Sequence, residues 1–116
     1  MTITVYGIKN CGTMQKAFSW LAERGVAYAF HDYKKEGVTE AALARWCDAA
    51  GWEKVINRAG MTFRKLPDEA KADLTREKAI ALMLARPGMI KRPVLEAPGT
   101  LEIGFKPERY AEIFGA

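Results

Sequence analysis

The opening of the chain has the pattern of a strand, a polar turn and an amphipathic helix, and this order limits the folds that it can adopt. Residues 3–6 form a short β-rich run. Gly25 is placed to end the following helix in a left-handed cap, and residues 26–33 have the aromatic content of a second strand. The pattern therefore predicts a β-α-β unit. The apolar face of its helix is expected to comprise Met14, Ala17, Phe18, Leu21 and Ala22.

The middle of the chain is predicted to be helical, and its end returns to strands. Thr39 and Thr75 are candidate N-caps, and Pro67 suits the first turn of a short helix. The turn residues 97–100 lie between apolar runs and indicate a β-hairpin, after which Pro107 opens a last helix. The order β-α-β, several helices and β-β-α predicts one α/β domain over residues 1–116.

Composition narrows the class of protein. Hydrophobic residues make up 49% of the 116 residues, but no apolar run approaches the roughly 20 residues of a membrane span. The net charge is +4 and the basic residues are dispersed, so an anionic ligand is a better fit than a nucleic-acid or membrane partner. Two cysteines do not form a disulfide scaffold, and the N-terminus lacks the pattern of a signal peptide. We therefore expect a cytoplasmic protein without a metal site.

The most informative residue is Cys11, which lies in the turn between the first strand and the first helix. Backbone N–H groups at the start of a helix stabilise a thiolate and lower the thiol pKa. Lys9, Asn10, Gly12 and Thr13 are the neighbouring candidates for stabilising that thiolate. The alternative is a buried cysteine that acts as a small hydrophobic residue.

The position three residues after Cys11 is occupied by Met14, so the chain has no C-x-x-C pair. Cys47 shares a predicted helical face with Leu43 and Trp46, which favours a role in core packing. A catalytic Cys11 would then need its second thiol from a small thiol, from another protein, or from Cys47 acting as a resolving cysteine. The sequence alone leaves these alternatives open.

The chain resembles the arsenate reductase/Spx/YffB group of thioredoxin-like proteins (the ArsC-like family), and the YffB-like branch most of all. Four segments carry the resemblance, which covers essentially the whole chain: Tyr6–Cys11, Phe30–Lys34, Asn57–Leu66 and Ile90–Pro93. The resemblance implies a thioredoxin-like fold with a mixed sheet and an inserted all-helical subdomain. Its core would span about residues 1–35 and 88–116, and the helical insertion about residues 36–87.

The same resemblance implies the residues of the site. The nucleophile of the family falls on Cys11, and a proline expected to be cis falls on Pro93. Two of the three arginines that hold an oxyanion in the arsenate reductases fall on Arg58 and Arg92. The third falls near Lys106, which keeps the charge but lacks the planar fork of a guanidinium. These residues would form a pocket for an anion or for glutathione.

The resemblance leads to three hypotheses about function. The first is a glutathione-dependent thiol oxidoreductase that uses one nucleophilic cysteine, with glutathione or another small anionic thiol as co-substrate and no bound cofactor. The second is an arsenate reductase linked to glutaredoxin as its partner. The third is a non-enzymatic, Spx-like transcriptional regulator that binds RNA polymerase. Met14 argues against the third, because it breaks the C-x-x-C switch of such regulators.

Overall fold

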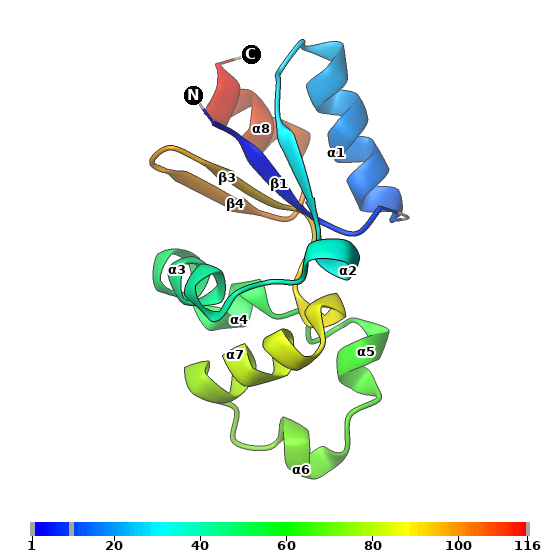
Figure 1. The fold of residues 1–116 in the computed structure, drawn as a ribbon, viewed down its shortest axis with the longest axis vertical. Helices are drawn as coiled ribbons and strands as arrows, with labels where there is room; N and C mark the ends of the chain where they lie inside the picture. Colours follow the sequence, from blue (N-terminus) through cyan, green and yellow to red (C-terminus); the bar gives the residue numbers. More distant parts are fainter. Residues whose placement is uncertain (1, 10, 116) are drawn as a thin grey trace. The chain divides into compact units, whose positions relative to one another are not determined.

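A computed structural model describes residues 2–9 and 11–115 and divides the chain into two compact units (Figure 1). Met1–Glu36 and Arg92–Ala116 form a unit that contains a β-sheet, and Gly37–Lys91 form a helical unit. The helical unit extends past the expected limit at residue 87 because its last residues bond back into it. The backbone N–H of Lys91 donates to the carbonyl of Val55, with an N···O distance of 2.8 Å.

The sheet is mixed and has four strands in the order β2-β1-β3-β4. Strand β1 pairs in parallel with β2 and antiparallel with β3, which in turn pairs antiparallel with β4. The predicted α/β fold, with a β-α-β unit followed by a β-hairpin, is therefore confirmed. The strands are β1 (Thr4–Gly7), β2 (Ala29–Asp32), β3 (Val94–Ala97) and β4 (Thr100–Ile103).

Helix α1 (Gly12–Glu23) ends in the predicted left-handed cap at Gly25, which has φ 66°. The N–H of Gly25 donates to the carbonyl of Ala22, and that of Val26 donates to Leu21, which is the hydrogen-bond pattern of a Schellman motif. Val26 thus belongs to the cap rather than to the second strand.

The second strand is shorter than the predicted 26–33 at both of its ends, and it begins only at Ala29. It stops at Asp32, whose side chain accepts a hydrogen bond from the N–H of Lys34 at 2.9 Å. The chain then enters the short helix α2 (Tyr33–Glu36). Turn chemistry at Asp32 therefore places Tyr33 just beyond the end of the strand.

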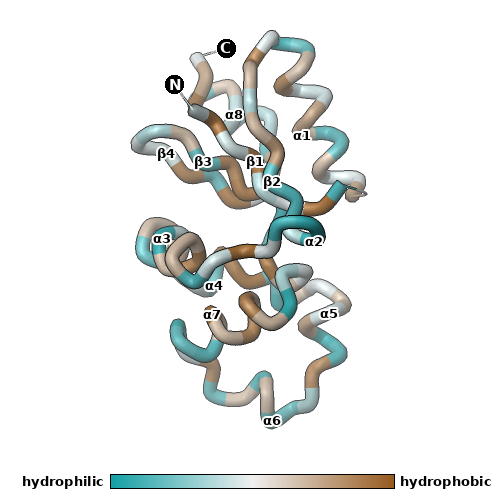
Figure 2. Tube along the Cα trace, viewed as in Figure 1, coloured by the Kyte–Doolittle hydropathy of each residue, from teal (hydrophilic) through white to brown (hydrophobic). Residues whose placement is uncertain are grey.

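The core of the sheet unit lies between the sheet and helices α1 and α8 (Pro107–Phe114). Val5 and Leu95 are cross-strand partners and are fully buried in the same apolar cluster as residues of both helices. Hydrophobic residues accordingly gather along β1 and β3 (Figure 2). Trp20 joins the helices, since its ring lies 5.5 Å from that of Tyr110. Ala22 is exposed, so the expectation that it belongs to the apolar face of α1 is wrong, and Trp20 is buried there instead.

The helical unit contains the two caps that the sequence predicts. The side-chain oxygens of Thr39 and Thr75 accept hydrogen bonds from the N–H groups of Ala42 and Lys78 at 3.1 and 3.2 Å. Pro67 is the N-cap of its short helix rather than a residue of the first turn. The elements are α3 (Glu40–Ala50), α4 (Trp52–Val55), α5 (Met61–Arg64), α6 (Asp68–Lys71), α7 (Arg76–Ala85) and the 3-10 helix η1 (Pro87–Met89).

Residues 2–9 and 11–115 lack two features that would indicate other classes of protein. None of their helices combines the length and the apolar character needed to cross a bilayer. Their His, Cys, Asp and Glu side chains form no cluster of three or more that could hold a metal ion.

Candidate active site

One end of the sheet brings together several segments that the sequence singles out. The register sets Gly7 opposite Asp32, and Val94 opposite both Tyr6 and Ile103, so the ends of β1, β2 and β4 lie beside the start of β3. Residues that flank these strand ends are thereby drawn to the same edge: Cys11 after β1, Tyr33 after β2, Arg92 and Pro93 before β3, and Lys106 after β4.

Cys11 is the N-cap residue of α1 and is half-buried. Its backbone is extended, with φ −134° and ψ 132°, and its carbonyl accepts the first helical hydrogen bond from Gln15 at 3.0 Å. An N-cap side chain lies beside the free N–H groups of the first turn. The first turn of α1 carries no acidic residue that would oppose a thiolate.

The Arg92–Pro93 peptide bond, which directly precedes β3, is cis. The carbonyl of Pro93 accepts a hydrogen bond from the N–H of Gly104 at 2.8 Å, which ties this segment to the end of β4. Arg92 is half-buried and its side chain is a hydrogen-bond donor to the thiol of Cys11. The pairing of β3 with β1 thus places the guanidinium of Arg92 beside the thiol of Cys11.

These contacts decide the protonation of the Cys11 thiol. Burial alone would raise its pKa, but hydrogen bonds from the backbone N–H of Met14, the side chain of Arg92 and the N–H of Thr13 outweigh that effect. The positive charge of Arg92 acts in the same direction. The pKa of Cys11 is therefore lowered, which favours a nucleophilic thiolate.

The second cysteine has the opposite character. Cys47 lies on α3 in the core of the helical unit and is only 5% exposed. Burial raises the pKa of its thiol, and the positive charge of Arg76, which lowers it, does not compensate. Met14, which takes the place of a second thiol after Cys11, is fully buried as well. Cys11 is thus the one accessible thiol of the chain.

The other residues predicted to stabilise the thiolate differ in their placement. Thr13 contributes its backbone N–H rather than its hydroxyl. Lys9 and Gly12 are not among the described groups that act on the pKa of Cys11, and their part in stabilising the thiolate stays a prediction. Asn10 lies outside the described residues.

The predicted anion-binding residues fall on both units. Lys106 is the N-cap residue of α8 at the same end of the sheet as Cys11. Arg58 belongs to the helical unit, where its guanidinium lies 5.7 Å from the ring centre of Trp52. Within the sheet unit, the basic residue that acts directly on the thiol is Arg92.

Tyr33 is a residue of this edge that sequence reasoning missed. It is 2% exposed, and its hydroxyl makes no hydrogen bond to any residue that the structure describes. Burial strongly raises the pKa of Tyr33, and the nearby charge of Arg92 acts against that rise. The hydroxyl is therefore a neutral donor near Arg92. The signal in the sequence is the Asp32-Tyr33 pair, where a turn residue ends the strand.

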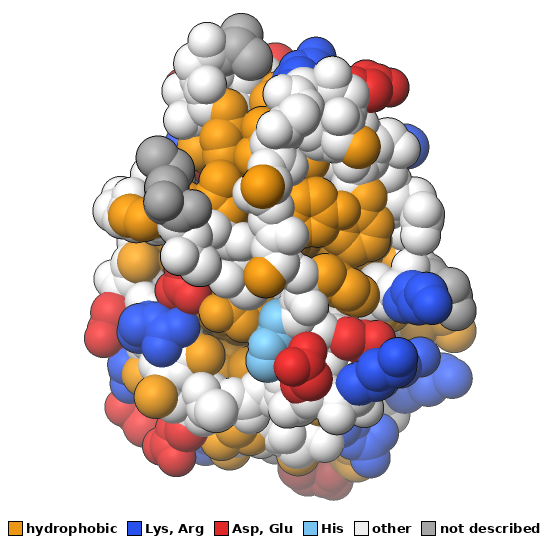
Figure 3. All heavy atoms as spheres, turned by 45° about the horizontal axis from the view of Figure 1, so that its top comes forward, with side chains coloured by type: hydrophobic (Ala, Val, Ile, Leu, Met, Phe, Trp, Pro, Cys, Tyr) orange, Lys and Arg blue, Asp and Glu red, His pale blue; other side chains and the backbone are white. Residues whose placement is uncertain are grey.

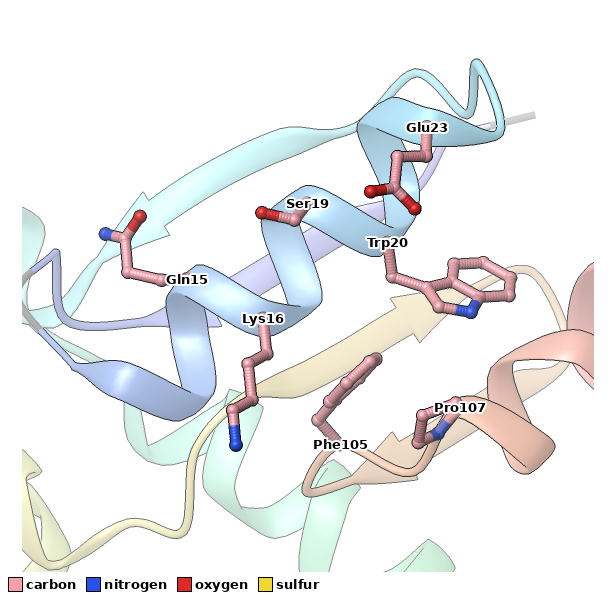
Figure 4. A pocket seen from close by; sticks show the side chains of 7 residues that line it. All are labelled: Gln15, Lys16, Ser19, Trp20, Glu23, Phe105 and Pro107. Carbon is pink, nitrogen blue, oxygen red and sulfur yellow. The ribbon is translucent and has the colours of Figure 1, made fainter.

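Two grooves flank α1. One lies along β2 and is lined by aromatic and charged side chains. Figure 3 shows a face of the molecule on which exposed hydrophobic side chains lie beside charged ones. The other lies between α1 and the segment that leads into α8, with a volume of about 380 Å³. Figure 4 shows Trp20, Phe105 and Pro107 on its apolar side and Lys16 extending toward the same segment. Lys106 lies between Phe105 and Pro107 in the sequence but is not among the residues that line this groove.

The sheet combines a β-α-β unit with a β-β-α unit. At one end of it, a thiol with a lowered pKa lies at a helix N-terminus, and an arginine and a cis-proline lie at the same end. These features together define a thioredoxin-like thiol protein. The family described as ArsC matches residues 6–113. The chain therefore belongs to the ArsC family. At the level that its relatives establish, it is an arsenate-reductase-like thiol oxidoreductase.

Relatives and solved structures support this placement. The solved structure of a YFFB protein is 58% identical, covers 96% of this chain and 97% of its own, and has a TM-score of 0.94. An uncharacterized protein of Haemophilus influenzae is 36% identical over 112 residues, 97% of this chain and 98% of that protein. An arsenate reductase of Rhizobium meliloti is 29% identical over 102 residues, which make up 84% of this chain and 71% of that protein. A global transcriptional regulator Spx of Enterococcus faecalis is 24% identical over 105 residues, which make up 89% of this chain and 79% of that protein.

Proposed function

We propose that the protein is a glutathione-dependent thiol oxidoreductase that uses Cys11 as its single nucleophile. The observation that carries the proposal is the contrast between the thiols. Cys11 is accessible and has a lowered pKa, whereas Cys47 is buried and has a raised one. Because Met14 fills the position of a nearby second thiol, the reaction has to draw that thiol from solution.

The reaction at Cys11 then has two exchange steps. The Cys11 thiolate attacks one sulfur of an oxidised substrate, the substrate S–S bond breaks, and its other half leaves as a thiolate. The thiolate of glutathione next attacks the mixed disulfide, and Cys11 leaves as a thiolate. The contacts that lower the pKa of Cys11 also make it a good leaving group. The other half of the substrate is then joined to glutathione in a mixed disulfide, and the thiolate of a second glutathione attacks its glutathione sulfur, releases that half as a thiolate and forms oxidised glutathione. Two glutathione thiols thus supply the two electrons that reduce one substrate disulfide.

Basic groups at the same edge suit an anionic thiol such as glutathione, which carries two carboxylates. A guanidinium such as that of Arg92 can bind a carboxylate through two parallel hydrogen bonds. Lys106 offers a second cation at the start of α8, at the same end of the sheet as Cys11. A helix N-terminus adds a favourable potential for negative charge.

The test compares Cys11→Ala and Cys47→Ala in a glutathione-coupled assay with a small aliphatic disulfide as substrate. Mass spectrometry of each variant after exposure to oxidised glutathione then shows which cysteine forms an adduct. We expect Cys47→Ala to keep its turnover and to form one glutathione adduct on Cys11, and Cys11→Ala to lose both. Turnover that depends on Cys47, or an intramolecular disulfide as the main product, would overturn the single-cysteine mechanism.

Arsenate reduction is a second candidate, favoured by the hydrogen bond from Arg92 to the nucleophile and by the likeness to a Rhizobium meliloti arsenate reductase. In this reaction the Cys11 sulfur would form a bond to the arsenic of arsenate held by Arg92, and one As–O bond would break with its oxygen leaving as water. External thiols, glutathione with glutaredoxin, would supply the two electrons that reduce arsenic(V) to arsenic(III). Arsenate turnover with these two thiols should collapse in Arg92→Met if this function is right. Absence of arsenate turnover in a protein that reduces the aliphatic disulfide would exclude it.

A further inference from the structure

The groove between α1 and β2 has the size and lining of a small-molecule site. Its volume is about 430 Å³, within the range of roughly 300–1,000 Å³ that is common for ligand pockets. It is lined by Lys9, Gln15, Phe18, Tyr28, Phe30, Asp32, Lys35 and Glu36.

Three aromatic rings form the apolar part of this groove. Phe18 of α1 stacks on Tyr28 with ring centres 5.6 Å apart and planes 5° apart, and it meets Phe30 edge-on at 5.1 Å. Tyr28 and Phe30 are two residues apart along an extended segment, so both side chains face α1. All three rings are only partly buried. The groove therefore offers aromatic surface to a planar group.

The groove lining carries charges of both signs, two ammonium groups and two carboxylates, and the two kinds differ in how the fold engages them. Asp32 accepts a hydrogen bond from the N–H of Lys34, and Glu36 accepts one from the N–H of Asp32 at 3.3 Å. Both carboxylates are thus engaged by the fold. Lys9 and Lys35, in contrast, form no ion pair with any residue that the structure describes. A ligand in this groove would therefore meet two available ammonium groups.

The groove adjoins the turn that carries the nucleophile. Lys9 lies two positions before Cys11, and Gln15 begins the next turn after it. The side-chain amide of Gln15 donates to the carbonyl of Lys9 at 3.0 Å, while its backbone N–H donates to the carbonyl of Cys11 at 3.0 Å. These two hydrogen bonds fix the groove lining to the backbone of the Cys11 turn.

From these contacts we propose that the groove binds an aromatic carboxylate or sulfonate, as one part of the disulfide substrate that Cys11 attacks. The inference rests on the proposed function and adds a substrate class to it. The aromatic part packs on Phe18, Tyr28 and Phe30, and the acid group pairs with Lys35 and Lys9. The Cys11 thiolate forms a bond to one substrate sulfur, the substrate S–S bond breaks, and an aryl thiolate leaves with the electron pair.

The test uses Cys47→Ala protein and three disulfides: dithiobis(nitrobenzoate), which is aromatic and anionic, dithiodipyridine, which is aromatic and neutral, and hydroxyethyl disulfide, which is aliphatic and neutral. Lys35→Ala should slow the first reaction by about twofold to fivefold and leave the other two unchanged. Lys34→Ala is the matched control, because Lys34 is exposed on the same short helix but does not line the groove. Tyr28→Leu should slow both aromatic reagents and spare the aliphatic one.

A binding measurement that does not need the thiol completes the test. Anilinonaphthalene sulfonate should bind Cys11→Ser protein, and Lys35→Ala should weaken that binding more than Lys34→Ala does. Equal effects of the two lysine variants, or no effect of Tyr28→Leu and Lys35→Ala, would overturn the proposal that the groove binds an aromatic acid. Such a result would leave the role of Cys11 as the nucleophile intact. A Cys11 that reacts with none of the three disulfides would instead overturn the proposed function.

Discussion

The side chain of Met14 fills the space beside Gly7, where the Cβ of any larger residue would meet the Met14 sulfur and its methyl group. This contact joins the end of β1 to the first turn of α1, on either side of the turn that holds Cys11. It places a fully buried thioether where a C-x-x-C protein has its second thiol. The packing of the fold and the single-thiol chemistry therefore depend on the same residue.

Gly7→Ala should destabilise the protein by about 1–3 kcal/mol, because the added methyl group overpacks a site already filled by Met14. Urea unfolding of the variant measures this change. Gly12→Ala is the matched control, since nothing lies within 4 Å of a Cβ at that position, and it should change the free energy of unfolding by less than about 0.5 kcal/mol or raise it. A smaller residue at the contact, in Gly7→Ala/Met14→Ala, should cost less than the two single changes together. Strict additivity would contradict the contact.

Replacing Arg92 should raise the pKa of Cys11, because Arg92→Met removes both a hydrogen bond and a positive charge from the thiolate. The rate of alkylation as a function of pH, in Cys47→Ala protein, gives this pKa directly. Arg92→Lys should have a smaller effect, since it keeps the charge. Lys106→Met is the control and should leave the pKa in place, as Lys106 is not among the groups that act on the thiol. An alkylation profile that is the same with and without Arg92 would show that the helix N-terminus alone activates Cys11.

The lowered pKa of Cys11 also makes stability depend on pH. An acid whose pKa is lower in the folded state stabilises the fold fully above its unfolded pKa, near 9.0 for a thiol, and loses that contribution as the pH falls through the folded pKa. In a Cys47→Ala background, the difference in unfolding free energy between Cys11 and Cys11→Ala protein should therefore grow from about pH 6 to about pH 10. The background matters because burial raises the pKa of Cys47, which gives a contribution of opposite sign. A difference that shrinks with rising pH would refute a stabilised thiolate.

Local signals in the sequence predict much of this molecule. The caps at Thr39 and Thr75, the left-handed Gly25 and the position of Cys11 before a helix all depend on neighbours within a few residues. The hairpin between β3 and β4 is local in the same way.

The features that the sequence does not predict depend on strand pairing. Arg92 reaches the thiol because β3 pairs antiparallel with β1, and without the family resemblance the sequence offers no reason to connect them. Lys9 is close to Cys11 along the chain, yet it lines the groove along β2. Proximity in sequence is thus a poor guide to which cation acts on a thiol.

Two buried tyrosines provide a matched pair for testing the edge of the sheet. The hydroxyls of Tyr33 and Tyr110 are both buried and make no hydrogen bond to the residues that the structure describes. Because no hydrogen bond is lost, Tyr33→Phe and Tyr110→Phe should each change the free energy of unfolding by less than about 1 kcal/mol. They should differ in function, since Tyr33 lies near Arg92, whereas Tyr110 packs among the rings of Trp20 and Phe105.

If the Tyr33 hydroxyl donates to an anionic thiol held by Arg92, Tyr33→Phe should raise the KM for glutathione on the order of tenfold and leave kcat nearly unchanged. Tyr110→Phe should leave both constants at the wild-type values. The measurement is a glutathione titration of the aliphatic disulfide assay in the two variants. Equal KM values in the variants and the wild-type protein would remove Tyr33 from the binding site, while a joint rise in both variants would trace the effect to the packing of the sheet unit.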